Sequence, residues 1–392
     1  MRRRERLLGE WDTMPLDDLL ALARETVEDP NMPTVAAWRE GGGHVVGHFQ
    51  VYCPEEIIHA AGLLPVKVRG AQVEPRQAEG RFGSYLCSIL KTSLELGLSG
   101  RLALDLFVTH PICDAARNLA AVWSRNFTYP ARILYLPQNP NSIASLAYLR
   151  DEYQRLLDDV EEVSGTRVTP VALRQSIEVF NRNRALLRQL YTIRRDTPWR
   201  LSVDECYALV ALGGLVTREE HNALVARALT LLSDRPSQPR DLLRVVFEGG
   251  FCEQPPLELL RTIAASCYVV DDDLLIGLRW LLEPVECNAA DDPLQALARS
   301  YLDASSYSPV QHDLRKPKEL MLLKRIRDAG AQAVIVAAAK MCEPGLEEQV
   351  AYSHALDAHG ISYFVTEFEE RMTTYDHLQI QLETFVENVM FA

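Results

Sequence analysis

The stretch Ala103–Leu119, ALDLFVTHPICDAARNL, contains a strand pattern, a turn and a helix pattern in that order. Its first part is a short apolar run rich in β-branched and aromatic residues, which predicts a buried strand. After the turn, Cys113 lies in the first turn of a predicted helix. The stretch Ala331–Pro344, AQAVIVAAAKMCEP, has the same order and ends at Cys342. Two such units favour an open α/β fold, with each cysteine at the carboxyl end of a strand, where these folds bind ligands.

Strand and helix patterns alternate on both sides of these stretches. Strands are predicted at 44–52, 65–70, 102–110, 131–139, 242–250, 266–273, 331–339 and 361–369. Residues 144–235 instead show long helical periodicity. We expect two Rossmann-like (flavodoxin-like) domains with mainly parallel sheets and related architecture, separated by helices. The predicted division is a helical segment at 1–40, an α/β domain with Cys87 and Cys113 at 41–143, a helical segment at 144–238, and an α/β domain with Cys342 at 239–392.

The composition is that of an ordinary globular protein. The 392 residues allow two or three domains, and 47% of them are hydrophobic and 24% charged. The formal charge of −13 argues against nucleic acid or an anionic membrane as partner. No apolar run approaches the roughly 18 residues of a membrane span, and the basic start has no apolar signal segment. We therefore expect a cytoplasmic protein.

Eight cysteines in such a chain suggest metal or redox use rather than disulfides. No CxxC pair occurs, so spacing alone indicates neither a zinc ribbon nor a ferredoxin-type cluster. A single cysteine is more often a small buried hydrophobe. Cys87, Cys113 and Cys342 differ because each opens a predicted helix, where free N–H groups and the helix dipole favour a thiolate. Three converging thiolates would suit an iron–sulfur cluster with one iron left open.

A second candidate group lies in CPEEIIHAAGLLP, Cys53–Pro65. Glu55 and Glu56 fall in the first turn of a predicted helix, and His59 follows one turn later. The pattern predicts either a general acid/base pair beside a strand end or a well-started helix with a core-facing histidine. The residues alone do not choose between these.

Other polar positions are open to two interpretations each. Arg117 and Asn118 follow Cys113 on its helix, and Arg117 could bind a substrate phosphate or carboxylate, or pair with Asp114. The glycine turn at 247–256 contains Cys252, a further candidate ligand. The acidic run 270–273 could bind Mg²⁺, although acidic residues at the end of a strand more often serve solubility. No P-loop occurs, so we do not expect this chain to bind ATP.

Several of these segments occur together in one known family. They are CPEEIIHAAGLLP, SYLCSILKTSLELGL, HPICDAARNLAAVW, LYLPQNP, GGFCEQPP, VVDDDL, AAAKMCEP and EFEERMTTYDHLQIQLETFVENVMF. They follow one another in this order along almost the whole chain. With them, the chain resembles the 2-hydroxyacyl-CoA dehydratase and benzoyl-CoA reductase family from about residue 44 to its end. The segments 113–123, 136–139 and 179–191 are most similar to the smaller substrate-side subunit of ATP-dependent benzoyl-CoA reductases.

The resemblance implies that Cys87, Cys113 and Cys342 hold a [4Fe–4S] cluster whose open iron faces an acyl-CoA thioester. A double-cubane cluster shared by two chains is the alternative. The implied reaction is the oxygen-sensitive, ATP-driven reductive dearomatisation of an aromatic acyl-CoA to a cyclic diene. Glu55, Glu56 or His59 would handle the protons.

The implied partners are a homologous larger substrate-side subunit, ATP-hydrolysing iron–sulfur activator subunits, and a low-potential electron donor such as ferredoxin. Two alternatives stay open. One is a subunit of a 2-hydroxyacyl-CoA dehydratase, which removes water by radical chemistry and recycles its electron. The other is a cluster-free structural subunit whose cysteines serve packing.

Overall fold

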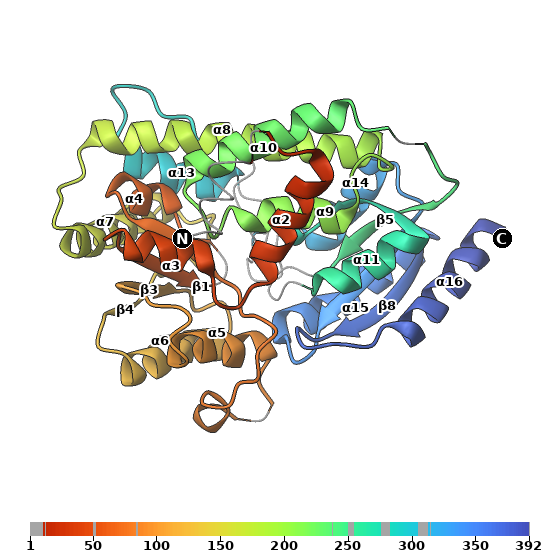
Figure 1. The fold of residues 1–392 in the computed structure, drawn as a ribbon, viewed down its shortest axis with the longest axis horizontal. Coiled ribbons are helices and arrows are strands. Elements are labelled where there is room, and N and C mark those ends of the chain that lie inside the picture. Colours follow the sequence, from red (N-terminus) through yellow and green to blue (C-terminus); the bar gives the residue numbers. More distant parts are fainter. Residues whose placement is uncertain are drawn as a thin grey trace.

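The computed structural model describes the chain apart from residues 1–10, 12, 50–51, 84, 237, 250–254, 276–282, 305–312, 314 and 392. Its described strands form two all-parallel, four-stranded sheets flanked by helices (Figure 1). The predicted α/β class with two Rossmann-like domains is therefore confirmed. Cys252 lies outside the described residues, so its role as a candidate ligand stays a prediction.

The first sheet has the strand order β2-β1-β3-β4. Its strands are β1 Val45–Phe49, β2 Leu64–Val68, β3 Leu106–Thr109 and β4 Ala131–Ile133. Its helices are α4 Glu55–Ala60, α5 Ser88–Leu98 and α6 Asp114–Asn126, with a 3₁₀ turn, η1, at Glu79–Arg81. Every residue of β1, β2 and β3 is buried, as expected for parallel strands covered on both faces.

The second sheet has the order β6-β5-β7-β8. Its strands are β5 Leu243–Glu248, β6 Cys267–Asp272, β7 Ala333–Ala339 and β8 Ser362–Phe368. Its helices are α11 Leu257–Ser266, α14 Lys318–Ala329, α15 Glu343–Ala358 and α16 Asp376–Phe391. Helix α13, Pro293–Ala304, lies between β6 and β7 in the chain but packs against α7 and α8. Counted within each half, both sheets follow the flavodoxin-like order 2-1-3-4. The two halves therefore share one architecture, and each has a switch point between its first and third strands.

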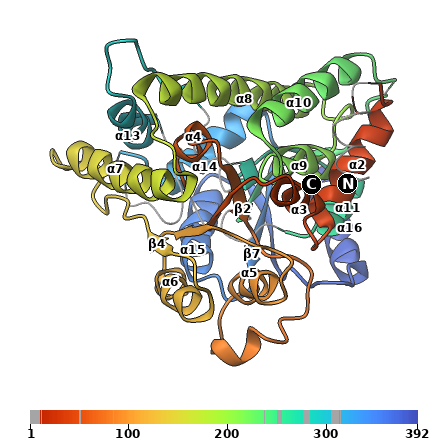
Figure 2. The same cartoon turned by 60° about the vertical axis from the view of Figure 1, so that its left-hand side comes forward.

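The remaining helices hold the two halves together. They are α2 Leu16–Glu28, α3 Pro33–Glu40, α7 Ser145–Ser164, α8 Pro170–Asp196, α9 Val203–Leu212 and α10 Arg218–Ser233. Helix α8 packs against both α4 and β6, so it runs across the first and second halves (Figures 1 and 2). Capping boxes at Ser202 and Thr217 start α9 and α10 by satisfying their first backbone N–H groups.

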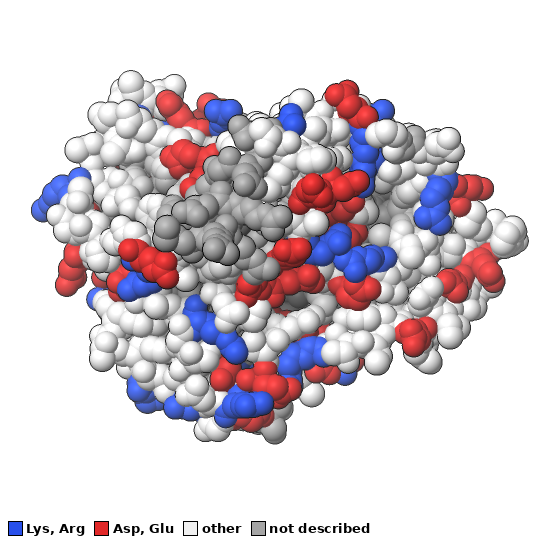
Figure 3. Space-filling view, viewed as in Figure 1, with Lys and Arg blue, Asp and Glu red and all other residues white. Residues whose placement is uncertain are grey.

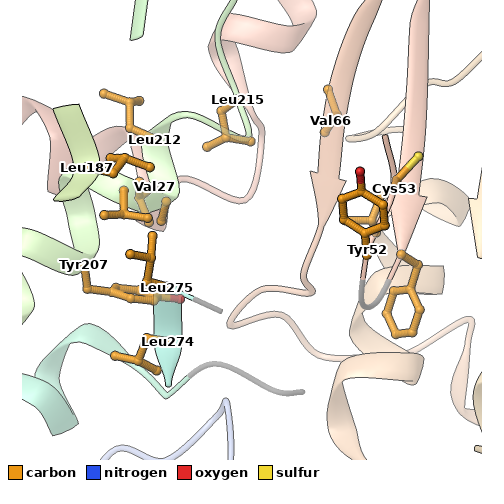
Figure 4. Packing of buried hydrophobic residues seen from close by; sticks show 14 of the residues in the cluster. Val27, Tyr52, Cys53, Val66, Leu187, Tyr207, Leu212, Leu215, Leu274 and Leu275 are labelled. Atoms are coloured by element: carbon orange, nitrogen blue, oxygen red, sulfur yellow. The ribbon is translucent and has the colours of Figure 1, made fainter. Parts of the chain in front are cut away.

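One large hydrophobic cluster extends through both halves and the helices between them. In Figure 4, Leu187, Leu212 and Tyr207 of the helical segment lie on one side, and Val66 and Tyr52 of the first half lie on the other. A smaller cluster fills the space between the second sheet and the helices α14 and α15. Both faces of the second sheet are therefore covered, as a parallel sheet requires.

Charged side chains of both signs are mixed on the molecular surface. Acidic and basic groups are interspersed over the side drawn in Figure 3, in keeping with the net charge of −13. Within the described part of the chain, no helix has both the length and the apolar character needed to cross a bilayer.

Candidate functional site

A cavity of about 300 Å³ lies between the two α/β halves. Its walls come from the end of β1 and from the first turns of α5, α6 and α15. Cys87, Cys113 and Cys342 all line it, although 229 residues separate Cys113 from Cys342 in the sequence. The fold therefore brings the three cysteines singled out in the sequence to one place.

Each of these cysteines is the N-cap of a helix: Cys87 of α5, Cys113 of α6 and Cys342 of α15. An N-cap side chain faces the backbone N–H groups that the first helical turn leaves without intrahelical partners. The Ala116 N–H donates to Cys113 Sγ at 3.4 Å. Three helix N-termini thus surround one cavity, and their dipoles favour negative charge there.

The Cys113 thiol is nevertheless expected to be protonated when nothing else is bound. Burial raises the pKa of Cys113, and the nearby Cys342 sulfur raises it further. The N–H groups of Ala116 and Ala115 act in the opposite direction and lower this pKa, but they do not outweigh burial. A bound cation would change this balance, because metal ligation deprotonates thiols.

Apolar side chains make up most of the remaining cavity wall, among them Phe49, Leu90 and Ile112. Two exposed apolar side chains lie at the rim: Tyr85 is 75% exposed and Met341 is 58% exposed. Met341 also has a left-handed backbone, with φ 60, directly before Cys342. A residue with a side chain adopts this conformation at a cost, and such strain clusters at functional sites.

The donor set of the cavity includes three thiols, the ligand type that iron–sulfur clusters use. Among the described residues, no three His, Cys, Asp or Glu side chains are placed to hold a metal ion together. An iron–sulfur cluster makes a different demand, because each of its cysteines binds a different iron atom. Three helix-capping thiols in an apolar cavity have the chemistry that such a cluster requires, so Cys87, Cys113 and Cys342 are the residues that could hold one.

The carboxylates of Glu55 and Glu56, on α4, are not among the described residues that line the cysteine cavity. Glu55 is buried; its Oε1 lies 2.9 Å from His48 Nε2, and its Oε2 accepts a hydrogen bond from Arg218. Glu56, which is also buried, accepts a hydrogen bond from Arg184. Both arginines come from the helical segment. Glu55 and Glu56 thus dock that segment onto the first half through buried ion pairs.

His59 contacts other residues of the same two helices, α8 and α10. Its Nδ1 is 2.8 Å from Ser176 Oγ and its Nε2 is 3.0 Å from Glu219 Oε1. The described lining of the cysteine cavity contains neither His59 nor the two glutamates. The structure therefore does not bring the three predicted acid/base residues to one spot with the cysteines, and their proton-handling role stays a prediction.

Arg117 and Asn118 are exposed on α6. Arg117 pairs with the Asp114 carboxylate, and Asn118 Nδ2 donates to the Asp114 backbone oxygen at 2.8 Å. Asp114 itself lines the cavity. The pairing with Asp114 was one of the two interpretations of Arg117, and substrate binding by either residue stays a prediction.

Two aspartates of the acidic run at the end of β6 form ion pairs with arginines. Asp271 accepts from Arg325 Nε at 2.8 Å, and the Asp272 side chain pairs with the buried Arg194. These are ion pairs of the kind that explain an acidic strand end without Mg²⁺. Neither the rim residues Tyr85 and Met341 nor the buried arginines were found from the sequence, because exposure and ion pairing depend on tertiary contacts.

The fold and the cavity define a two-domain α/β protein with a cysteine-lined site between its domains.

A family described as 2-hydroxyglutaryl-CoA dehydratase, D-component, matches residues 50–389. The chain is 33% identical over 384 residues to a benzoyl-CoA reductase subunit of Thauera aromatica, covering 96% of this chain and 99% of the relative. It is 27% identical over 375 residues to lactoyl-CoA dehydratase subunit beta of Anaerotignum propionicum, covering 95% and 99%. It is 24% identical over 367 residues to (R)-2-hydroxyglutaryl-CoA dehydratase subunit beta of Acidaminococcus fermentans, covering 91% and 95%.

The chain therefore belongs to the 2-hydroxyacyl-CoA dehydratase and benzoyl-CoA reductase family. The family resemblance read from the sequence is confirmed. Each of these relatives is named as one subunit of a larger enzyme.

Proposed function

We propose that this chain is a subunit of an iron–sulfur benzoyl-CoA reductase, which reduces the ring of an aromatic acyl-CoA to a cyclic diene. The observation that carries the proposal is the meeting of Cys87, Cys113 and Cys342 at three helix N-termini in one apolar cavity. The 33% identity to a benzoyl-CoA reductase subunit over nearly the whole chain supports this proposal.

In this proposal the three cysteines hold a [4Fe–4S] cluster, or one half of a double-cubane cluster. When bound, the cluster would supply low-potential electrons to the thioester-activated acyl group. The chain's own residues would provide the surroundings. Helix N–H groups such as that of Ala116 would stabilise sulfur charge, and hydrogen bonds to sulfur are one determinant of cluster potential.

The apolar wall would receive the acyl group. Phe49, Leu90 and Ile112 offer surface without charge, which suits an aromatic ring and keeps water from competing for the site. The electrons would come from outside this chain, through ATP-hydrolysing iron–sulfur activator subunits fed by a donor such as ferredoxin. A homologous larger subunit would complete the substrate site.

The test is the iron and acid-labile sulfide content of anaerobically purified protein. We expect about four of each per chain, and strong depletion in Cys113→Ser. The matched control is Cys206→Ala, because Cys206 is buried in α9 away from the cavity and should not affect the metal content. About eight iron atoms per pair of chains would require spectroscopy to separate two cubanes from a double cubane. Iron-free protein, with Cys113→Ser folding normally, would leave a structural subunit as the function.

A second candidate is a subunit of a 2-hydroxyacyl-CoA dehydratase. The family description and the relatives at 27% and 24% identity are dehydratases, which favours this reaction class. The two functions differ in their use of reductant. A dehydratase turns over without net reductant and releases water, whereas the proposed reductase consumes electrons in proportion to product. Assays with benzoyl-CoA and with a 2-hydroxyacyl-CoA, each with reductant measured, separate them.

A further inference from the structure

A buried hydrogen bond joins the two halves of the chain close to the cysteine cavity. The Thr92 hydroxyl, on α5, donates to the Glu370 carboxylate beyond β8, with 2.5 Å between Oγ1 and Oε2. Both side chains are buried; Thr92 is fully enclosed and Glu370 is 7% exposed. A buried bond to a charged acceptor is strong and directional, because water does not compete for it.

Each end of this hydrogen bond is connected to a cavity cysteine by a short path along the chain. Thr92 lies in the same helix that Cys87 caps, little more than one turn away. On the other side, the Lys340 N–H donates to the Phe368 carbonyl at 2.9 Å, which joins the ends of β7 and β8. Lys340 is two residues before Cys342, and Phe368 is two residues before Glu370. The bond thus fixes the first half of the cavity wall against the second.

Gly70 makes this close approach possible. It follows β2 with φ +75, and a Cβ atom there would lie 2.5 Å from Thr92 Oγ1 and closer still to the Glu370 carboxylate. Any side chain at this position would therefore push Thr92 and Glu370 apart. Gly62 has the same φ of +75, but a Cβ atom there would meet nothing within 4 Å.

We propose that Thr92, Glu370 and Gly70 form an interdomain latch that positions the Cys342 side of the cavity against the Cys87 and Cys113 side. The three are positioning residues, because they act on the spacing of the thiols and do not themselves line the cavity as described. The latch keeps the cavity at the size at which all three thiols can reach one ligand. The part of the proposal that concerns iron rests on the proposed function, but the part that concerns thiol spacing does not.

The experiment measures thiol spacing in the metal-free, full-length protein. Dibromobimane bridges two thiols by losing both bromides, so the rate of bridging Cys113 to Cys342, identified by peptide mass spectrometry, reports how often the two sulfurs are close. The variants are Gly70→Ala and Thr92→Val. Their matched controls are Gly62→Ala, with the same backbone strain but open space, and Thr92→Ser, which restores the hydroxyl.

We expect Gly70→Ala and Thr92→Val to slow bridging by about tenfold, the effect of about 1.4 kcal/mol in favour of an open arrangement. Gly62→Ala and Thr92→Ser should bridge at the rate of the unmodified chain. Bridging at that rate in a folded Thr92→Val variant would overturn the latch, even if Gly70→Ala failed to fold. Reconstituted iron should fall in the same two variants, while iron-free wild-type protein with the expected bridging pattern would refute the cluster and leave the latch standing.

Discussion

Cys113 and Cys342 occupy the same position in the two halves of the chain, since each caps the helix that follows the third strand of a 2-1-3-4 parallel sheet. Both lie next to a switch point, where open α/β sheets bind ligands. One half of the protein could not form this site alone, because the cavity is lined by the ends of both. The repeated architecture therefore places two equivalent thiols face to face, and Cys87 on α5 adds the third.

The burial of the cysteines predicts which of them react with alkylating reagents. Cys87 and Cys113 are partly exposed, whereas Cys206 and Cys267 are buried outside the cavity. Burial raises the pKa of Cys206 and of Cys267 to about 12 each. Iodoacetamide on folded, metal-free protein should thus modify Cys87 and Cys113 at least about tenfold faster than the buried pair, because the reagent can reach them and because burial suppresses the thiolates of Cys206 and Cys267.

Mass spectrometry of the alkylated peptides measures these rates. Protein unfolded in urea is the control, since all the thiols should then react alike. Equal rates in the folded state would mean that the cavity does not expose its cysteines.

The buried ion pairs of α4 predict a large stability effect. Arg218→Met leaves the Glu55 carboxylate buried without its guanidinium, which is expected to lower the free energy of unfolding by about 3–5 kcal/mol. Lys324→Met is the control. Its partner Asp328 is one turn away on the surface, and such pairs contribute about 0.3–0.5 kcal/mol. Urea titrations of both variants measure the difference; similar small losses would show that Glu55 does not depend on Arg218.

Replacing Met341 with glycine is expected to raise the stability of the protein. The left-handed backbone of Met341 costs energy that glycine would not incur, and its side chain gives little packing in return because it is 58% exposed. Met341→Gly should therefore stabilise the protein by about 1 kcal/mol while removing part of the cavity rim. Met32 is the matched control, with φ 44 but a buried side chain.

Met32→Gly relieves similar backbone strain but leaves a hole in the core, so it should destabilise the protein by about 2 kcal/mol or more. Thermal unfolding followed by circular dichroism measures both variants. Opposite signs for the two would show that packing offsets the backbone strain at Met32 but not at Met341. A loss of stability in both would show that the exposed methionine has a packing role instead.

The fold was predictable from the sequence because its signals are local. The apolar runs before Cys113 and Cys342 specify strands, and the capping residues at Ser202 and Thr217 specify helix starts. The place of the cysteines at the helix starts was predictable for the same reason.

The partners that the helical segment offers to Glu55, Glu56 and His59 were not predictable. They lie 117 to 163 residues away in the chain, and only the packing of α8 and α10 on α4 brings them near. Local spacing correctly put two carboxylates and an imidazole on one short helix. It did not reveal that these side chains face different neighbours.

The free energy of unfolding is expected to depend on pH because of His110. This histidine follows β3, and its Nδ1 lies 3.0 Å from the Leu134 carbonyl oxygen, to which the neutral ring donates. The pKa of His110 is lowered to about 3, chiefly by burial; the Leu134 carbonyl opposes this shift, and the nearby Lys67 and His48 add to it. The unfolded chain binds a proton at this histidine near pH 6.5 and the folded chain only near pH 3, so acid favours unfolding between these values.

The size of this effect follows from the same two values. The free energy of unfolding should fall by about 2 kcal/mol between about pH 7 and about pH 5 because of His110 alone, a range in which most carboxylates stay ionised. His110→Asn keeps a donor for Leu134 but does not titrate, so this part of the loss should disappear in urea titrations at the two pH values. His359→Asn is the control, since His359 also contacts a backbone carbonyl, at 2.8 Å, but is exposed. If His110→Asn lost stability toward acid as steeply as the unmodified chain, another group would have to be responsible.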